Sequence, residues 1–390
     1  MIRGKNILLG VSGGIAAYKT LELCSRLKKE GANLKIIMTK AACEFVSPLS
    51  FETMGKCIVY SEMFEGHHDK VYHIELPKWA DVFLLAPLSA NTLAKMTYGI
   101  ADNMLTASIL ACDKDIIVAP TMNTNMLKNE ATQKNLKIIK DRGVHIINPN
   151  SGLLACDTSG DGRMEEPKNI VRYLDYYFTK KDLNGKKIIV SAGPTVEPID
   201  YVRFITNKSS GKMGYNIAIE AFKRGAEVKL VSGPVNPMDT FGIDKINIRT
   251  NKDLKDAIDK EFDDCDALIM SAAPTDYKVR EVSDKKIKKN GDNLKLELIE
   301  NIDILKYFGN KKYKQILIGF AAETDDLIKN AKIKLESKKA DYIIANDLKK
   351  KGAGFDVDTN IASILSKDKV EKLDIMTKKE LANKILDLLV

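Results

Sequence analysis

The stretch NILLGVSGGIAAYKT, residues 6–20, contains the pattern that decides the fold. Its first six residues are mostly apolar, as in a strand that is buried on both faces, and its last residues have helical spacing. Glycines stand at 10, 13 and 14, where the chain must turn tightly from strand into helix. We therefore predict a strand, a glycine-rich turn and a helix whose first N–H groups can hold a phosphate.

The same alternation of apolar runs and amphipathic stretches continues to about residue 178. Further strands are expected in LKIIMT (34–39), DVFLLAP (81–87), DIIVAP (115–120) and VHIINP (144–149). The stretch AYKTLELCSRLKKEG (17–31) is predicted to be a helix that Gly31 ends. This order of elements is typical of a doubly wound parallel sheet.

The pattern lapses in the polar segment FTKKDLNGKK (178–187) and begins again with KIIVSAGPT (187–195) and the predicted helix GKMGYNIAIEAFKRGA (211–226). More strands are expected in EVKLVSG, DALIMSAAP, ILIGFAAET, DYIIAND and NIASILS. The stretch KKIKKNGDNLKLELIE (285–300) predicts a β-hairpin with Asn290 and Gly291 at its turn. The sequence thus predicts an α/β protein with two doubly wound, Rossmann-like domains, residues 1–180 and 184–390.

Composition narrows the class of protein. The 390 residues are 44% hydrophobic, and no apolar run approaches the length of a membrane span. The N-terminal segment lacks the features of a signal peptide, so we expect a cytoplasmic protein without a membrane role. The basic residues are dispersed, so the net charge of +8 indicates small polyanionic substrates rather than nucleic acid. No CxxC spacing suggests zinc or a disulfide framework among Cys24, Cys43, Cys57, Cys112, Cys156 and Cys265.

The residues after the second predicted strand bear on the ligand of the first domain. A dinucleotide site needs an Asp or Glu there to bind the ribose hydroxyls. This strand ends in Thr39 and Lys40 instead, which disfavours NAD. A hydroxyl beside small residues and free helix N–H groups favours a mononucleotide phosphate or a ribityl chain.

His73 is one of four histidines in the chain. It precedes a predicted buried strand that leads into a loop rich in Pro, Ser, Asn and Thr, and such loops bind ligands at the carboxyl ends of parallel strands. From the sequence pattern alone, a structural histidine and a functional one are equally good interpretations.

Several long motifs, taken together and in order, carry a specific resemblance. SGGIAAYK (12–19), HIELPKWAD (73–81), APLSANTLAKMTYGIADN (86–103) and APTMNTNM (119–126) resemble the flavoprotein half of the bifunctional phosphopantothenoylcysteine decarboxylase/phosphopantothenate-cysteine ligase family of coenzyme A synthesis. SAGPTVEPIDYVRFITNKSSGKMG (191–214), SAAPTDYK (271–278), KIKK (286–289), GFAAET (319–324) and ADYIIAND (340–347) resemble its ligase half. The resemblance therefore covers nearly the whole chain.

For the first half, the resemblance implies noncovalent FMN, held at Ser12, Gly13, Thr39, Ser89 and Asn91. FMN would oxidise the substrate thiol to a thioaldehyde, which supplies the electron sink that loss of carbon dioxide requires. The resemblance further implies that His73 acts in the oxidative decarboxylation and that Asn123 contacts the substrate carboxylate. It also implies that Cys156 donates a proton to the enethiol. Asp157 stands where the family commonly has glycine, which changes the expected shape of this flap.

For the second half, the segment SSGKMG lacks the spacing of a P-loop, so the nucleotide phosphates must be held in another way. Lysines on an edge segment such as KIKK are usually only solvated, and this interpretation would stand without the neighbouring motifs. The resemblance implies activation of 4'-phosphopantothenate by CTP with Mg²⁺, followed by attack of the L-cysteine amine on the acyl-cytidylate. It assigns Asn207 to the acyl-cytidylate chemistry and assigns nucleotide contacts to Asp276, Lys286, Phe320 and Lys338. Ile302 stands where the family often has proline.

Two other functions are compatible with parts of the sequence. A flavin enzyme of the prenyltransferase type would share the glycine-rich turn but would have no ligase half. A basic nucleotide- or RNA-binding protein without catalysis would explain the charge alone and would bind RNA in a salt-dependent way. The family resemblance also implies a homo-oligomer, with trimeric flavin domains and dimeric ligase domains.

Overall fold

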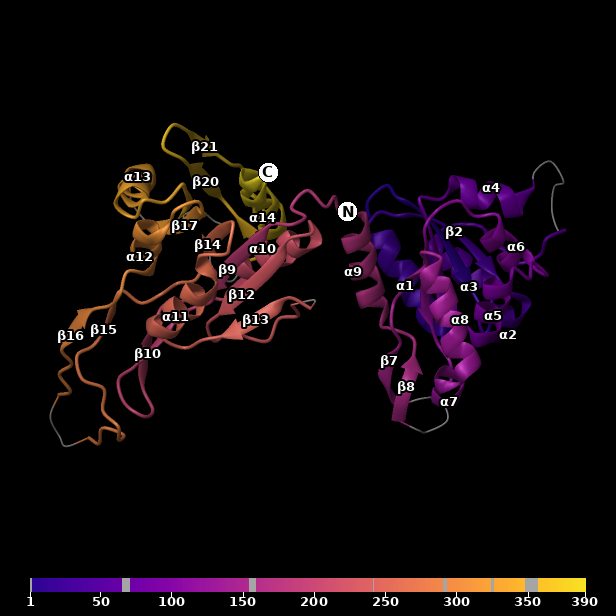
Figure 1. Cartoon of the computed structure of the whole chain (residues 1–390), viewed down its shortest axis with the longest axis horizontal. Coiled ribbons are helices and arrows are strands. Elements are labelled where there is room, and N and C mark those ends of the chain that lie inside the picture. Colours follow the sequence, from indigo (N-terminus) through magenta and orange to yellow (C-terminus); the bar gives the residue numbers. More distant parts are fainter. Residues whose placement is uncertain are drawn as a thin grey trace. The chain divides into compact units, whose positions relative to one another are not determined.

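The computed structural model describes residues 2–64, 71–153, 159–240, 242–289, 293–323, 326–347 and 357–390. The chain divides into two compact units, Met1–Thr179 and Lys180–Val390. Among the residues with a described structure, no helix combines the length and the apolar character needed to cross a membrane. Each unit is built around its own sheet, which is parallel in the first unit and mostly parallel in the second (Figure 1).

The sheet of the first unit has six strands in the order β3-β2-β1-β4-β5-β6, and all neighbouring pairs are parallel. These strands are β1 (Asn6–Val11), β2 (Asn33–Met38), β3 (Val59–Tyr60), β4 (Val82–Leu88), β5 (Ile116–Pro120) and β6 (His145–Ile146). The helices are α1 (Ala17–Lys29), α2 (Lys40–Phe45), α3 (Pro48–Gly55), α4 (Tyr72–Trp79), α5 (Ala90–Tyr98), α6 (Met104–Leu110), α7 (Thr124–Lys128), α8 (Glu130–Asp141) and α9 (Pro167–Phe178). The predicted doubly wound fold is confirmed.

Strand β1 shows why helices must cover both faces of this sheet. Its alternate residues Leu9 and Val11 pack with α1, α3 and α9, whereas Leu8 packs with α4, α5, α6 and α8. All these side chains are fully buried, as expected for a parallel sheet inside two helical layers. Gly31 has φ +83° just beyond α1, so the predicted glycine stop is also confirmed.

An antiparallel hairpin of β7 (Asn150–Leu153) and β8 (Ser159–Arg163) follows the sheet. Its second strand is bonded to the loop after β5, because the Met122 amide donates to the Gly162 carbonyl at 2.9 Å. The Thr124 hydroxyl donates to the Asp161 carbonyl at 2.7 Å. Cys156 and Asp157 lie outside the described residues, between these two strands.

The sheet of the second unit has eight strands in the order β13-β12-β9-β14-β17-β18-β20-β21, in which only the pairs that involve β20 are antiparallel. These strands are β9 (Lys187–Ala192), β12 (Glu227–Ser232), β13 (Asp244–Asn247), β14 (Ala267–Met270), β17 (Ile316–Glu323), β18 (Tyr342–Asp347), β20 (Ala362–Leu365) and β21 (Val370–Lys372). One face packs on α10 (Lys212–Lys223) and α14 (Lys378–Leu386). The other face packs on α11 (Asn251–Phe262), α12 (Ile304–Lys311) and α13 (Leu327–Ser337).

Three small strand pairs complete the second unit, namely β10 (Val196–Pro198) with β11 (Phe204–Thr206), β15 (Tyr277–Val279) with β16 (Leu298–Glu300), and β19 (Thr359–Asn360) with β22 (Met376–Thr377). The predicted strands of the hairpin over 285–300 are wrong, because residues 285–289 and 293–297 form no strand and the pairing lies at 277–279 and 298–300. An isolated two-stranded ribbon is marginal without a further strand or a helix to cover it. The predicted turn residues Asn290 and Gly291 lie outside the described residues.

A buried arginine joins three segments of the second unit. Arg224 follows α10 and donates to Asp182 and Asp387, each at 2.8 Å, while only 7% of its side chain is exposed. Its hydrogen bond holds the pKa of Asp182 below the usual range, against the opposing effect of burial. The start of the unit and its C-terminal helix are therefore linked through one guanidinium.

We predict that Arg224→Ala lowers the free energy of unfolding of this unit by about 3 kcal/mol, because it leaves a largely buried carboxylate without its partner. The stabilisation is present at neutral pH and is lost as the pH falls through the lowered pKa of Asp182, so the difference from wild type should shrink below about pH 4. Denaturant titrations at both pH values measure this. Arg280→Ala removes an exposed ion pair with Glu297 and should cost under about 1 kcal/mol; an equal cost would contradict the prediction.

Candidate functional sites

The first unit contains a cavity of about 850 Å³ at the carboxyl edge of its sheet. It is lined by the turn after β1, the start of α2, the loop from β4 into α5, the start of α6 and the loop after β5. The predicted residues that line it are Gly13, Thr39, Ser89 and Asn91. The structure thus brings these four residues to one cavity, although they come from three separate loops.

Side-chain caps shape the rim of this cavity. Thr39 accepts a hydrogen bond from the Ala42 amide at 3.1 Å and caps α2, and Ser89 accepts one from the Thr92 amide at 3.3 Å and caps α5. Each cap satisfies one backbone donor, while the remaining N–H groups at a helix start favour a negatively charged ligand. Gly14 also lines the cavity, and a Cβ atom added there would meet nothing within 4 Å.

Ser12 does not line the cavity. Its buried hydroxyl donates to the Pro87 carbonyl and accepts from the Ser89 amide, both at 2.8 Å, so it links the end of β1 to the end of β4. The next residue, Gly13, lies so close to α2 that an added Cβ would stand 2.5 Å from the Ala41 Cβ. Ser12 therefore orients the backbone of Ser89, while Gly13 permits the close approach of its turn to α2.

Two of the three residues predicted to act on the first substrate, His73 and Asn123, are described and do not line this cavity. His73 is half-buried in the first turn of α4. Asn123 caps α7 by accepting from the Asn125 amide at 2.8 Å, and its neighbour Met122 does line the cavity. Cys156 lies outside the described residues.

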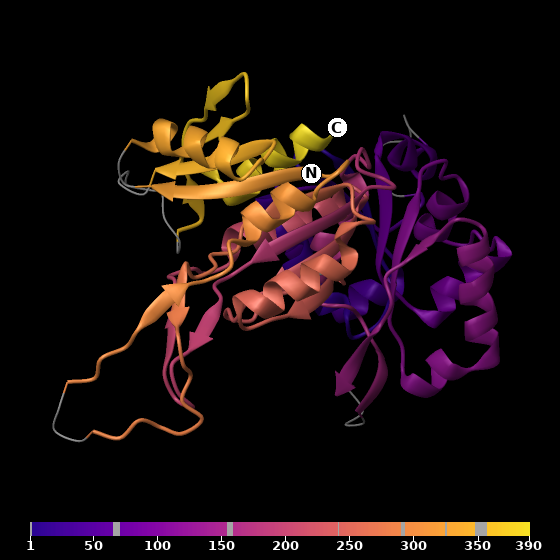
Figure 2. The same cartoon turned by 60° about the vertical axis from the view of Figure 1, so that its left-hand side comes forward.

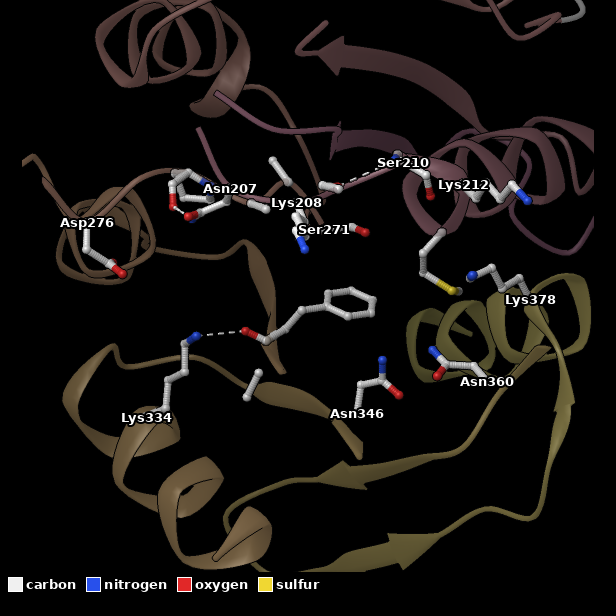
Figure 3. Close-up of a pocket in the computed structure, with 18 residues that line it drawn as sticks. Asn207, Lys208, Ser210, Lys212, Ser271, Asp276, Lys334, Asn346, Asn360 and Lys378 are labelled. Atoms are coloured by element: carbon white, nitrogen blue, oxygen red, sulfur yellow. Dashed lines mark hydrogen bonds between the residues drawn. The ribbon is translucent and has the colours of Figure 1, made fainter. Parts of the chain in front are cut away.

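The second unit contains a cavity of about 440 Å³ at the carboxyl edge of its own sheet. The predicted residues that line it are Asn207, Asp276 and Phe320. The Asn207 amide group donates to the Pro274 carbonyl at 2.9 Å, which ties the segment after β11 to the loop after β14. Figure 3 shows Asp276 and Lys334 at one end of the cavity and Lys212, Asn360 and Lys378 at the other.

A buried polar network holds the loops of this second cavity. The Thr195 hydroxyl donates to Asn251 Oδ1 at 2.6 Å and accepts from the Thr275 amide at 3.0 Å. The Asn251 Nδ2 group donates to the Thr275 carbonyl at 2.9 Å, and the Thr206 hydroxyl donates to the Thr195 carbonyl at 2.7 Å. Since Thr206 precedes Asn207 and Thr275 precedes Asp276, the network orients both cavity residues.

Two predicted lysines do not line the second cavity. Lys338 lies beyond α13 and pairs with Asp303, the cap of α12; burial opposes ionisation of this carboxyl, but its hydrogen bonds outweigh burial and hold its pKa below the usual range. Lys286 is exposed on the segment between β15 and β16. Neither lysine is therefore part of the cavity wall.

Sequence reasoning missed several polar residues that line the second cavity: Lys208, Lys212, Lys334, Asn346, Asn360 and Lys378. Lys212 stood in the quoted motif SSGKMG, and Asn346 stands at the carboxyl end of a predicted strand, so both could have been found from their position. The Oδ1 atom of Asn346 is buried without a hydrogen-bond partner among the described residues. Because an unpaired buried acceptor is costly, this atom favours a bound hydrogen-bond donor.

The charges around this cavity are mostly positive. The Lys212 ammonium lies 2.8 Å from the Asp358 carboxylate and holds the pKa of that carboxyl below the usual range. Lys334 donates to the Phe320 carbonyl at 2.8 Å, and Lys378 donates to the Val357 carbonyl. Among the described residues, no group of three or more His, Cys, Asp or Glu side chains could hold a metal ion. The cavity therefore suits a polyanionic ligand.

Together, a parallel-sheet domain with a capped, glycine-rich cavity and a second domain with a lysine-lined cavity define a two-domain α/β enzyme. Residues 1–178 match the family described as flavoprotein, and residues 183–390 match the family described as DNA/pantothenate metabolism flavoprotein C-terminal domain. The chain belongs to the family of coenzyme A biosynthesis bifunctional proteins, which unite a phosphopantothenoylcysteine decarboxylase and a phosphopantothenate-cysteine ligase.

Individual relatives match this chain over nearly the full length of both sequences. The coenzyme A biosynthesis bifunctional protein CoaBC of Bacillus subtilis (strain 168) is 44% identical over 392 residues, which cover 99% of this chain and 97% of the relative. The protein of the same name from Borreliella burgdorferi is 38% identical over 393 residues and covers 100% of both chains. A crystal structure of the C-terminal domain of a CoaBC protein is 40% identical and covers 54% of this chain and 96% of its own, with a TM-score of 0.47. Since both halves match, the chain is not a flavin enzyme without a ligase half.

The contact between the hairpin and the loop after β5 generates a prediction. Gly162 has φ +123°, and an added Cβ would lie 2.2 Å from the Met122 carbonyl oxygen, so Gly162→Ala should detach β8 from this loop. Hydrogen exchange of the Met122 amide should then accelerate by about fivefold or more, because one net hydrogen bond of about 1 kcal/mol or more is lost.

Gly143→Ala is the matched control for this prediction. Gly143 also has positive φ, +88°, but an added Cβ would meet nothing within 4 Å, so only backbone strain is introduced. Its substitution should leave the exchange of the Met122 amide unchanged. Equal exchange in both variants and the wild-type protein would contradict the proposed steric contact.

Proposed function

We propose that this chain joins 4'-phosphopantothenate to L-cysteine with CTP in its second unit and decarboxylates the product, phosphopantothenoylcysteine, with FMN in its first. The observation that carries the proposal is the presence of one polar cavity at the carboxyl edge of each sheet, lined by residues of the motifs that resemble each half. Incubation of the protein with 4'-phosphopantothenate, L-cysteine and CTP tests it, because 4'-phosphopantetheine forms only if both sites act.

The cavity of the first unit fits FMN in the chemistry of its lining. Gly13, Thr39, Ser89 and Asn91 would hold the cofactor, with hydroxyl and amide groups for its phosphate and ribityl chain. Ser12 would act indirectly, because its hydroxyl orients Ser89. When bound, FMN would accept two electrons from the substrate thiol, which supplies the electron sink that decarboxylation needs, and would return them as hydride to the enethiol product.

Protein groups supply the remaining steps of the decarboxylation. Asn123 would bind the substrate carboxylate, since it lies next to Met122 of the cavity lining and on the loop that β8 contacts. His73 would act at the oxidative decarboxylation step, and Cys156 would donate a proton to the enethiol carbon. These roles are carried from the resemblance onto the matching positions.

We further propose that the flavin domains form trimers and the ligase domains form dimers. His73 does not line the single-chain cavity, which is consistent with a site that a second copy completes. Large exposed apolar side chains near the turn after β1 and on α2 and α3 support such a contact: Ile15, Tyr18, Phe45 and Leu49. Exposed aromatic side chains on the strand pairs of the second unit, Tyr201, Phe204 and Tyr277, support another.

In the second unit, the 4'-phosphopantothenate carboxylate would displace pyrophosphate from CTP, and the cysteine amine would then displace CMP from the acyl-cytidylate. Asn207 would orient the carbonyl group and stabilise its developing negative charge, because its amide is already held at the cavity by the Pro274 carbonyl. Asp276 and Phe320 would contact the nucleotide. Lys286 would neutralise phosphate charge and Lys338 would make a further contact with the nucleotide, although neither lysine lines the cavity.

Magnesium would enter this site on the nucleotide. Asp276 is an acidic residue of the cavity lining, and one carboxylate together with phosphate oxygens is a typical Mg²⁺ environment. Lys212, Lys334 and Lys378 would offset the remaining charge of the triphosphate.

We predict that the purified protein is yellow and releases FMN, identified by its absorbance and by chromatography, when it is denatured. Ser12→Ala should weaken FMN binding by about tenfold, because the Ser89 amide loses its buried acceptor. Ser47→Ala is the control, since Ser47 is exposed and makes no capping hydrogen bond. Release of FAD or NAD would contradict the cofactor assignment.

The two activities should be separable by single substitutions. His73→Asn should lower carbon dioxide release by about a hundredfold or more, as expected for loss of a proton-transfer group, and leave amide synthesis within about twofold. Asn207→Asp should do the reverse. Assays of each step with its own substrate measure both, and parallel loss of both activities in one variant would contradict the assignment of the residues to separate sites.

Lys286→Gln should weaken the use of CTP while carbon dioxide release from phosphopantothenoylcysteine is unchanged. The loss of one charge-assisted contact to phosphate, about 1.5 to 3 kcal/mol, predicts an increase of about ten- to a hundredfold in the KM for CTP. Lys252→Gln, on the exposed side of α11, is the matched control. A normal KM for CTP would mean that KIKK is only a solvated segment.

A further inference from the structure

The carboxylate of Asp200 lies in the turn between β10 and β11, and its side chain is 0% exposed. It accepts hydrogen bonds from the Val202 and Arg203 amides and from the Arg203 guanidinium, each at 2.7 Å. A fourth donor is the amide of Ile287 at 3.1 Å, which stands 87 residues further along the chain. One buried carboxylate thus joins the turn to a distant segment.

Both backbone groups of one residue, Ile287, hold that segment in place. The Ile287 amide donates to Asp200, and the Ile287 carbonyl accepts from both Nη atoms of Arg203 at 3.3 Å. The Ser283 amide also donates to the Ile199 carbonyl at 3.1 Å. In both Figures 1 and 2, β10 runs beside the pair β15 and β16.

Ile287 stands between Lys286 and Lys288. Among the described residues, the segment 284–289 makes no other hydrogen bond to a separate part of the chain, and it belongs to no strand. The pairing of β15 with β16 ends at Val279, seven residues before Lys286. The hydrogen bonds at Ile287 therefore fix the position of the backbone from which the side chains of Lys286 and Lys288 extend.

The other end of the turn leads into the cavity of the second unit. Arg203 is followed by β11 (Phe204–Thr206), and Asn207 follows that strand directly. Asp200 is thus bonded to Arg203, directly before the strand that leads to Asn207, and to the segment that carries Lys286.

We infer that Asp200 is a positioning residue for the ligase reaction, which holds the segment bearing Lys286 in register with the strand that leads to Asn207. This inference rests on the proposed function of the second unit. An ionised carboxylate suits this task, because it only accepts hydrogen bonds and here meets four N–H donors. The amide of asparagine would turn an N–H₂ group toward some of these donors and leave them unpaired. Arg203 neutralises the carboxylate, so the charge of Lys286 stays available to an anionic ligand.

Asp200→Asn in the full-length protein tests the inference. The KM for CTP should rise by about tenfold, with kcat within about threefold and carbon dioxide release unchanged. Arg203→Lys should act in the same direction, because one ammonium cannot replace the guanidinium fork at Asp200 and Ile287. Glu220→Gln is the matched control, since it removes a buried carboxylate at the far end of α10 from the cavity and should leave the KM for CTP unchanged.

A double-mutant cycle separates positioning from general destabilisation. If Asp200 acts through Lys286, then Asp200→Asn should change the KM for CTP by less than about twofold in the Lys286→Gln background. A tenfold effect that persists in that background, or a normal KM in both Asp200→Asn and Arg203→Lys, would overturn the inference. If Lys286→Gln alone leaves the KM for CTP normal while amide synthesis is intact, then the proposed role of Lys286 is wrong. The inference would then fail because Lys286 has no role at the nucleotide, and not because Asp200 fails to position it.

Discussion

Parallel strand pairing is the constraint on which both units depend. A parallel strand buries its alternate side chains on two faces, as Leu8 and Leu9 of β1 do, and each face must be covered by helices. Polar groups that contact a ligand cannot lie within such a sheet, so they gather in the loops at its carboxyl edge. Both cavities lie at this edge, and one chain can therefore hold two different chemistries on two copies of one architectural plan.

At these edges, buried polar side chains replace water as partners of the backbone. Ser12 links two strand ends in the first unit, and Thr195 with Asn251 links two loops in the second. Asp200 does the same between a turn and a distant segment. Such groups do not line the cavities themselves, but an unpaired buried donor would be costly, so they restrict where the lining residues can lie.

Local patterns predicted most of the fold. The strands at 6–11, 82–88, 187–192 and 342–347 and the helix from Ala17 were expected from apolar runs and helical spacing. The same kind of pattern was misleading over 285–300, where the alternation predicted a hairpin. Residues 285–289 form no strand there, and Ile287 bonds to Asp200 instead. Among the residues that line the cavities, Thr39 was predicted from its place at a strand end, and Ser89, Asn207 and Asp276 were predicted from the family resemblance. Lys334 and Asn360 lie in stretches whose local pattern is ordinary.

The sequence by itself determined the two doubly wound domains and the family, because periodicity and long motifs are properties of neighbouring residues. Only the tertiary structure decided that Ser12 bonds Ser89 rather than lines the cavity, that Lys338 pairs with Asp303, and that Lys378 shares a cavity with Asn207. The physical reason is that hydrogen bonds and ion pairs between residues far apart in the chain depend on which loops the sheet brings together. That arrangement follows from strand order and packing, which no local pattern contains.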